Sequence, residues 1–98
     1  MPIKKQRLDP ELVEKVRQGD KKAFDQIFKK YGDGLFAFSL SYLKSKEMAE
    51  CLVQDIFLKI WENRRDLKKE SSLKSYLFTI AYHEICQIFR KKKYIKSS

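Results

Sequence analysis

The fold of this chain is decided by residues 71–93, which read SSLKSYLFTIAYHEICQIFRKKK. Two serines that can cap a helix begin the stretch, and apolar residues then recur every three or four positions, as on one side of an α-helix. The stripe predicted to be buried consists of Leu73, Leu77, Ile80, Ala81, Ile85, Ile88 and Phe89. Four consecutive cations, residues 90–93, end the stretch. We therefore predict a helix that buries one side in a core and presents a basic, aromatic side to an acidic polymer, which we expect to be nucleic acid.

The composition around this stretch favours a small helical domain. A chain of 98 residues suits one domain, and 43% hydrophobic residues are enough for folding. Three glycines and two prolines are few for a turn-rich β protein and favour long helices. The predicted fold class is all-α, a compact bundle of about four helices with short connections.

The net charge of +9 is unevenly distributed along the chain. Residues 64–98 carry ten Lys/Arg and three Asp/Glu, a net of +7, whereas residues 46–63 carry two and four, a net of −2. A basic charge of this size is typical of proteins that bind nucleic acid or an anionic surface. The alternative is a lysine-rich surface that serves only solubility.

The sequence contains no pattern typical of an enzyme or a metal site. Cys51 and Cys86 lack a CxxC or Cys/His spacing, and His83 is the only histidine. Phosphate-binding and nucleophile motifs such as GxGxxG and GxSxG are absent. Residues 1–10 are polar, unlike a signal peptide, and no apolar run approaches the roughly 18 residues that cross a bilayer. We therefore expect a cytoplasmic protein with reduced cysteines, no catalytic residue, no metal and no cofactor.

Three further helices are predicted before the C-terminal one. Residues 1–8 are expected to be flexible, and Asp9 followed by Pro10 is a strong start signal for the first helix. Asp20 is predicted to cap a long second helix, which the glycines of residues 32–34 can bend.

The third predicted helix covers residues 46–63 after a cap at Ser45. Its inner stripe is predicted to be Ala49, Leu52, Val53, Ile56, Phe57 and Ile60. On the opposite side, Leu58 and Trp61 stand among acidic and polar residues, a combination typical of a protein-docking face. The alternative for Trp61 is an ordinary core position.

Residues 49–61, AECLVQDIFLKIW, resemble the polymerase-docking helix of bacterial sigma factors of the extracytoplasmic-function (ECF) group. Residues 19–24, GDKKAF, resemble the opening helix turn of that group, and residues 73–81, LKSYLFTIA, resemble its promoter-recognition helix. The resemblance covers residues 9–93 and implies the fold of a sigma factor region 2 domain. Residues 94–98 are then expected to begin the linker to a second, helix-turn-helix domain that this chain lacks.

The resemblance also implies partners and site residues. It implies a transcription initiation module that binds the clamp helices of the largest RNA polymerase subunit, recognises and melts the minus-ten promoter element, and can pair with an anti-sigma factor. Polymerase docking is implied for Gln54, Asp55, Leu58, Trp61 and Glu62. DNA binding is implied for Leu67, Lys68, Lys69, Ser71, Ser72, Lys74, Tyr76, Thr79, His83, Gln87, Arg90, Lys91 and Lys92.

Two residues depart from the pattern of that group, and other interpretations stay open. Cys51 stands where members commonly carry an acid, and His83 stands where they commonly carry asparagine, which can change the base preference. Tyr76 and Tyr82 can alternatively lie at the edge of the core, and residues 91–93 can form a solvated tail. The alternative function is a helical protein–protein interaction adaptor without a DNA function. A basic surface bound to a membrane is disfavoured by the aromatic residues and the interrupted charge pattern.

Overall fold

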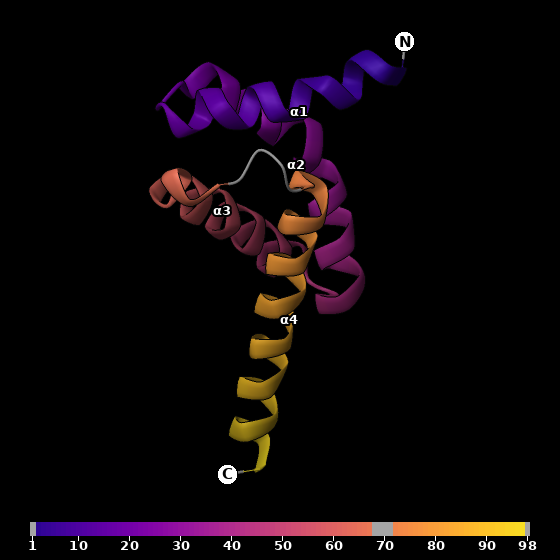
Figure 1. Ribbon diagram of the computed structural model, residues 1–98. Coiled ribbons are helices and arrows are strands. Elements are labelled where there is room, and N and C mark those ends of the chain that lie inside the picture. Colours follow the sequence, from indigo (N-terminus) through magenta and orange to yellow (C-terminus); the bar gives the residue numbers. More distant parts are fainter. Residues whose placement is uncertain (1, 68–71, 98) are drawn as a thin grey trace.

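The computed structural model describes the backbone of residues 2–67 and 72–97 and the side chains of residues 9–67 and 72–91. All regular elements within these residues are helices, which confirms the predicted all-α class (Figure 1). In chain order they are α1 (Pro2–Arg17), α2 (Lys21–Leu43), α3 (Lys46–Glu62), the short 3-10 helix η1 (Arg64–Asp66) and α4 (Leu73–Ser97). None of the described helices is long and apolar enough to span a membrane.

Helix α1 begins at Pro2, so the predicted helix start at Asp9 is wrong. The Asp9 carboxylate does not cap the helix because it contacts α2 instead, where it accepts hydrogen bonds from Lys30 Nζ at 2.6 Å and from the Tyr31 hydroxyl. Burial and this neighbouring carboxylate raise the pKa of Tyr31 well above its usual range. Pro10 lies inside the helix, where it cannot donate a backbone hydrogen bond to the preceding turn. These contacts of Asp9 hold α1 against α2.

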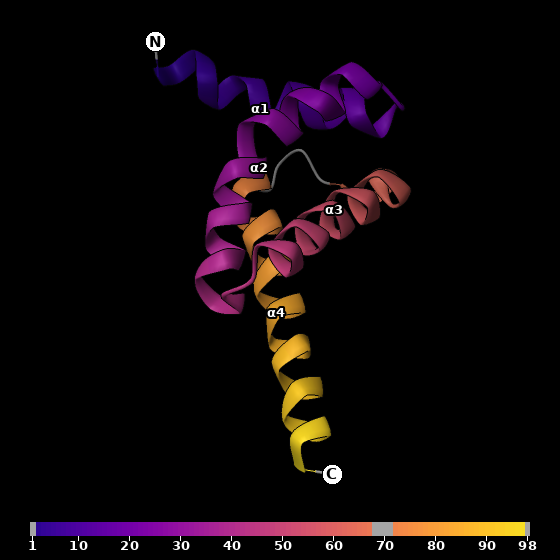
Figure 2. The same ribbon diagram turned by 180° about the vertical axis from the view of Figure 1, so that it is seen from behind.

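Helix α2 is one continuous helix, as predicted. The Asp20 carboxylate accepts hydrogen bonds from the N–H groups of Lys22 and Ala23 and so caps the first turn. The helix continues through both glycines, and Figures 1 and 2 show that its axis changes direction between the part beside α1 and the part beside α4. It ends where Lys44 adopts a left-handed conformation with φ 60° and donates its N–H to the carbonyl of Leu40.

Helix α3 matches the prediction most closely. Ser45 Oγ accepts a hydrogen bond from the N–H of Met48 at 3.2 Å and caps the helix. Every residue of the predicted inner stripe is buried: Ala49, Leu52, Val53, Ile56, Phe57 and Ile60. The stripe packs against α2, where the ring centroids of Phe28 and Phe57 lie 4.7 Å apart. This packing turns the opposite side of α3 to solvent.

Helix α4 buries only the first part of its predicted stripe. Leu73, Leu77, Ala81 and Ile85 are buried in the core shared with the other helices. Ile80 and Ile88 are half-buried, and Phe89 is 41% exposed. Both views show the reason, since the C-terminal part of α4 extends beyond the other three helices (Figures 1 and 2). The prediction that Phe89 is a core residue is therefore wrong.

Candidate functional site

The outer side of α3 brings together four of the five residues predicted to dock a partner protein. Gln54, Asp55, Leu58 and Glu62 are all exposed, and their spacing places them along one side of the helix. Leu58 is 54% exposed, an apolar side chain between two acids. Cys51 is exposed on the same side, one turn before Asp55. We call Gln54, Asp55, Leu58, Trp61 and Glu62 the docking face.

Trp61 belongs both to the core edge and to the docking face. The residue is half-buried, and its ring lies 5.1 Å from that of Phe24 on α2. The Arg64 guanidinium lies 4.4 Å from the indole centroid, and Arg64 Nη1 donates a hydrogen bond to the Trp61 carbonyl at 2.8 Å. The sequence analysis left both interpretations of Trp61 open and missed Arg64 altogether. The turn that follows α3 brings Arg64 back over the indole, a contact that helical periodicity does not predict.

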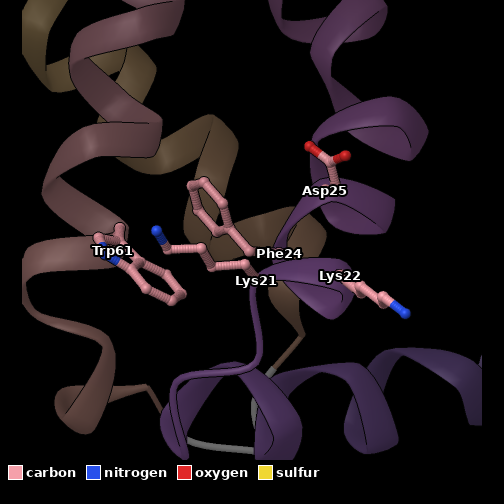
Figure 3. A pocket seen from close by; sticks show the side chains of 5 residues that line it. All are labelled: Lys21, Lys22, Phe24, Asp25 and Trp61. Atoms are coloured by element: carbon pink, nitrogen blue, oxygen red, sulfur yellow. The ribbon is translucent and has the colours of Figure 1, made fainter.

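A hollow of about 400 Å³ opens beside Trp61 at the start of α2. Figure 3 shows that the Lys21 side chain extends toward the indole, whereas the Lys22 side chain points away from it. Phe24 and Asp25 line the remaining wall. Two cations, Lys21 and Arg64, therefore lie beside Trp61, in contrast to the acids beside Leu58.

The connection between α3 and α4 differs from its predicted role at one residue. Leu67 was expected to contact DNA, but it is 4% exposed and belongs to the hydrophobic core. It directly follows η1, which lies against α1. Its side chain faces the core rather than a ligand. The other predicted residues of this connection, Lys68, Lys69 and Ser71, lie outside the described residues.

Most of the remaining residues predicted to bind DNA lie on the side of α4 that faces away from the core. Ser72 Oγ accepts a hydrogen bond from the N–H of Ser75 at 3.2 Å and caps the helix, as predicted. Eight residues predicted to bind DNA are exposed: Ser72, Lys74, Tyr76, Thr79, His83, Gln87, Arg90 and Lys91. Tyr76 is 40% exposed, which is more than is expected of a tyrosine at the edge of the core that exposes only its hydroxyl. We call these eight residues the polar face of α4; the side chain of Lys92 lies outside the described residues.

An aromatic cluster that the sequence analysis missed joins α2 to α4 beside the polar face. The rings of Phe38 and Phe78 lie 5.3 Å apart, those of Phe38 and Tyr42 lie 5.1 Å apart, and those of Tyr42 and Tyr82 lie 6.2 Å apart. Tyr82 is 52% exposed, and a hydrogen bond with Cys86 is the main cause that raises its pKa. The cluster fixes α4 to α2, so that its polar face turns outward.

Helices α3 and α4 share the hydrophobic core and are also linked by an ion pair. Lys59 on α3 forms an ion pair with Glu84 on α4, with 3.1 Å between Nζ and Oε2. Asp55 and Glu62, by contrast, form no ion pair with any side chain in residues 9–67 and 72–91. That part of the chain also lacks a group of three His, Cys, Asp or Glu side chains that could hold a metal ion. The described residues thus present two exposed polar surfaces, one on α3 and one on α4.

Comparison with known proteins identifies sequence relatives. The chain is 29% identical over 76 residues to "RNA polymerase sigma-H factor" of Pseudomonas aeruginosa, a match that covers 78% of this chain and 39% of the relative. It is 32% identical over 76 residues to "ECF RNA polymerase sigma-E factor" of Haemophilus influenzae, covering 78% of this chain and 40% of the relative. The chain thus spans about two-fifths of the length of these curated relatives.

The fold and the family agree with these relatives. The solved structure of CnrH in complex with the cytosolic domain of CnrY superimposes with a TM-score of 0.78 at 23% identity, covering 85% of this chain and 54% of that chain. The family described as Sigma-70 region 2 matches residues 27–94, which include the docking face and the polar face of α4. These matches confirm the resemblance to ECF sigma factors found in the sequence. The chain belongs to the sigma-70 region 2 family.

Proposed function

We propose that this chain is the part of a transcription initiation factor that binds RNA polymerase through α3 and the minus-ten promoter element through α4. The observation that carries the proposal is the pair of exposed faces on adjacent helices. One is apolar and acidic around Leu58, and the other is aromatic and basic around Tyr76. The Lys59–Glu84 ion pair supports a fixed relation between them. A chain with this role works in the cytoplasm.

The polar face of α4 has the chemistry needed to hold a melted DNA strand. Opening a duplex removes base stacking, and stacking on an aromatic ring such as that of Tyr76 contributes about 1–3 kcal/mol per base. His83 and Gln87 offer hydrogen-bond donors and acceptors for the base edges. Lys74 and Arg90 attract phosphates without reading the sequence. We propose that the polar face captures the single strand of the melted promoter element.

Tyr76→Ala is expected to weaken binding of a single-stranded promoter oligonucleotide by about five- to 100-fold, because one stacking platform is lost. Fluorescence anisotropy with the oligonucleotide, with the chain bound to its polymerase partner, measures the effect. Tyr76→Phe should bind almost normally because the ring is kept. Phe89→Ala is the matched control, since Phe89 is an exposed aromatic residue of α4 that does not belong to the polar face. Equal affinities for Tyr76→Ala and Phe89→Ala would contradict the DNA-binding role of Tyr76.

The docking face has the chemistry of a protein interface. Leu58 and the half-buried Trp61 offer apolar area, and Gln54 and Asp55, one turn before Leu58, offer hydrogen-bonding groups. We propose that this face binds the clamp helices of the largest polymerase subunit. The complex of CnrH with the cytosolic domain of CnrY supports a second protein partner, which we propose to be an anti-sigma factor.

Asp55→Ala and Gln54→Ala are each expected to weaken binding to a clamp-helix fragment by about tenfold, because each removes a polar contact from the centre of the interface. Isothermal titration calorimetry measures the dissociation constants. The midpoints of thermal unfolding should not change, since both side chains are exposed. Glu11→Ala, an exposed acid on α1, is the control. The docking role fails if both variants bind as tightly as this control.

A further inference from the structure

The aromatic cluster that joins α2 to α4 exposes two tyrosines that the proposed function leaves without a role. Phe38 and Phe78 are half-buried and form its base, with ring centroids 5.3 Å apart. Tyr42 on α2 is 42% exposed, and Tyr82 on α4 is 52% exposed, the highest value for an aromatic side chain among the described residues. The ring centroids of these two tyrosines lie 6.2 Å apart. We call Tyr42 and Tyr82 the tyrosine pair.

The tyrosine pair and the polar face lie on different sides of α4. Tyr82 follows Tyr76 by six residues, which at about 100° per residue turns it about 120° away around the helix axis. Neither side is the one that Leu77 and Ala81 bury in the core. Both views show that α4 continues beyond the other helices, so it is accessible from several directions (Figures 1 and 2). Helix α4 can therefore contact two strands at once.

The charges around the tyrosine pair favour an anionic partner. Residues 34–46, at the end of α2, contain two lysines and no carboxylate. Within residues 72–91 the single carboxylate is Glu84, which is paired with Lys59. Lys44, two residues after Tyr42, is exposed and forms no ion pair with another described side chain. A second copy of this chain, with its net charge of +9, is repelled by these cations.

Single-stranded nucleic acid offers both of the groups that this surface can bind. Its bases stack on aromatic rings whatever their sequence, and its phosphates are attracted by lysines. The ring of Tyr42 is held by Phe38, at 5.1 Å between centroids, so the surface is in place before a strand arrives. A preformed aromatic surface loses little conformational entropy on binding.

We infer that α4 stands between the two strands of the opened promoter element: the polar face holds one strand, and the tyrosine pair holds the other. The inference rests on the proposed function, because the strands separate at α4 only if its polar face captures the first of them. Melting unstacks the bases of both strands, and a second stacking surface opposes their return to the duplex. Charge complementarity and the position of the pair on the same helix as the polar face support the inference.

Two forked duplexes test which strand each side of α4 holds. Each fork leaves the promoter element unpaired on only one strand, and its paired part fixes the side of α4 that this strand reaches. Tyr82→Leu should weaken binding of one fork by about five- to 100-fold and leave the other unchanged, because leucine keeps apolar contact with Tyr42 but offers no stacking surface. Tyr76→Leu is the matched control and should do the reverse. Fluorescence anisotropy, with the chain bound to the clamp-helix fragment, measures both affinities.

The contribution of the cations is tested by Lys44→Gln. Loss of one phosphate contact should lower the slope of log affinity against log salt by about 0.7 for the fork that Tyr82 holds. Lys15→Gln makes the same change of charge at an exposed position on α1 and should leave the slope unchanged. Equal slopes for the two variants would remove Lys44 from the surface.

The strand itself is identified by photo-crosslinking. Tyr76 and Tyr82 are replaced, one at a time, by p-benzoylphenylalanine in the chain assembled with polymerase on a duplex that carries the promoter element. The two DNA strands carry different dyes. We expect position 76 to crosslink to one strand and position 82 to crosslink to its complement.

The outcomes separate this inference from the proposed function. If Tyr76→Leu weakens one fork but Tyr82→Leu weakens neither, α4 holds a single strand and only the inference is overturned. If Tyr82→Leu weakens both forks equally, its role is structural, and if positions 76 and 82 crosslink to the same strand, the assigned strand is wrong; both results overturn the inference. The same holds if Tyr82→Leu only abolishes sedimentation with phosphatidylglycerol vesicles. If Tyr76→Leu weakens neither fork, the proposed DNA binding by the polar face fails.

Discussion

Leu77→Ala is expected to lower the free energy of unfolding by about 2–5 kcal/mol, the cost of deleting a large side chain from a packed core. Leu77 is 0% exposed and lies at the centre of the buried part of α4. Its removal leaves a cavity where α4 meets the core, and the rigid neighbours can fill it only in part. Chemical denaturation followed by circular dichroism measures the change. Such a loss is a large fraction of the stability of a typical small domain.

Phe89→Ala is the matched control for this prediction. Periodicity alone places Phe89 on the same stripe, but the side chain is 41% exposed where α4 extends beyond the other helices. Its replacement should change the free energy of unfolding by less than about 1 kcal/mol. If Phe89→Ala costs as much as Leu77→Ala, the end of α4 is packed in solution and the arrangement in Figure 1 is wrong there.

The features that sequence analysis predicted well depend on residues close together in the chain. The cap at Ser45 and the buried stripe of α3 follow from helical periodicity, and both are confirmed. The exposure of Gln54 and Asp55 follows from the same periodicity, because residues off the stripe must face solvent. The exposure of Tyr76 is explained in the same way on α4.

The features that sequence analysis missed depend on contacts between distant residues. Asp9 has the local sequence of a cap, but its carboxylate is bound by Lys30 and Tyr31 on another helix. Leu67 lies in a polar connection, yet it is buried because η1 packs against α1. A hollow lined by Asp33 of α2 and Glu50 of α3 forms only because these two helices pack side by side in antiparallel directions. Periodicity predicts which side of a helix is apolar, but it does not predict which other helix that side contacts.

Trp61→Ala is expected to weaken binding of the clamp-helix fragment by about tenfold to 100-fold, as is typical of a tryptophan that contributes strongly to an interface. The indole is held by Phe24 on one helix and by Arg64 after α3, so its exposed part is rigid before the partner binds. A rigid aromatic side chain loses little conformational entropy on binding. The same substitution should also lower the free energy of unfolding, because Trp61 packs on the core. Calorimetric titration and thermal unfolding must therefore be measured together.

Ile60→Val separates the two roles of Trp61. Ile60 is the neighbouring residue, is 2% exposed and points inward, so its truncation costs about 0.5–1.5 kcal/mol of stability without changing the docking face. Affinities should be compared at a temperature at which both variants are fully folded. If Trp61 contributes to docking, Trp61→Ala binds far more weakly than Ile60→Val, and Trp61→Phe, which keeps a ring against Phe24, binds with intermediate affinity. If Trp61→Ala and Ile60→Val bind equally well, Trp61 is a core residue alone, and the docking face is limited to the exposed residues from Gln54 to Glu62.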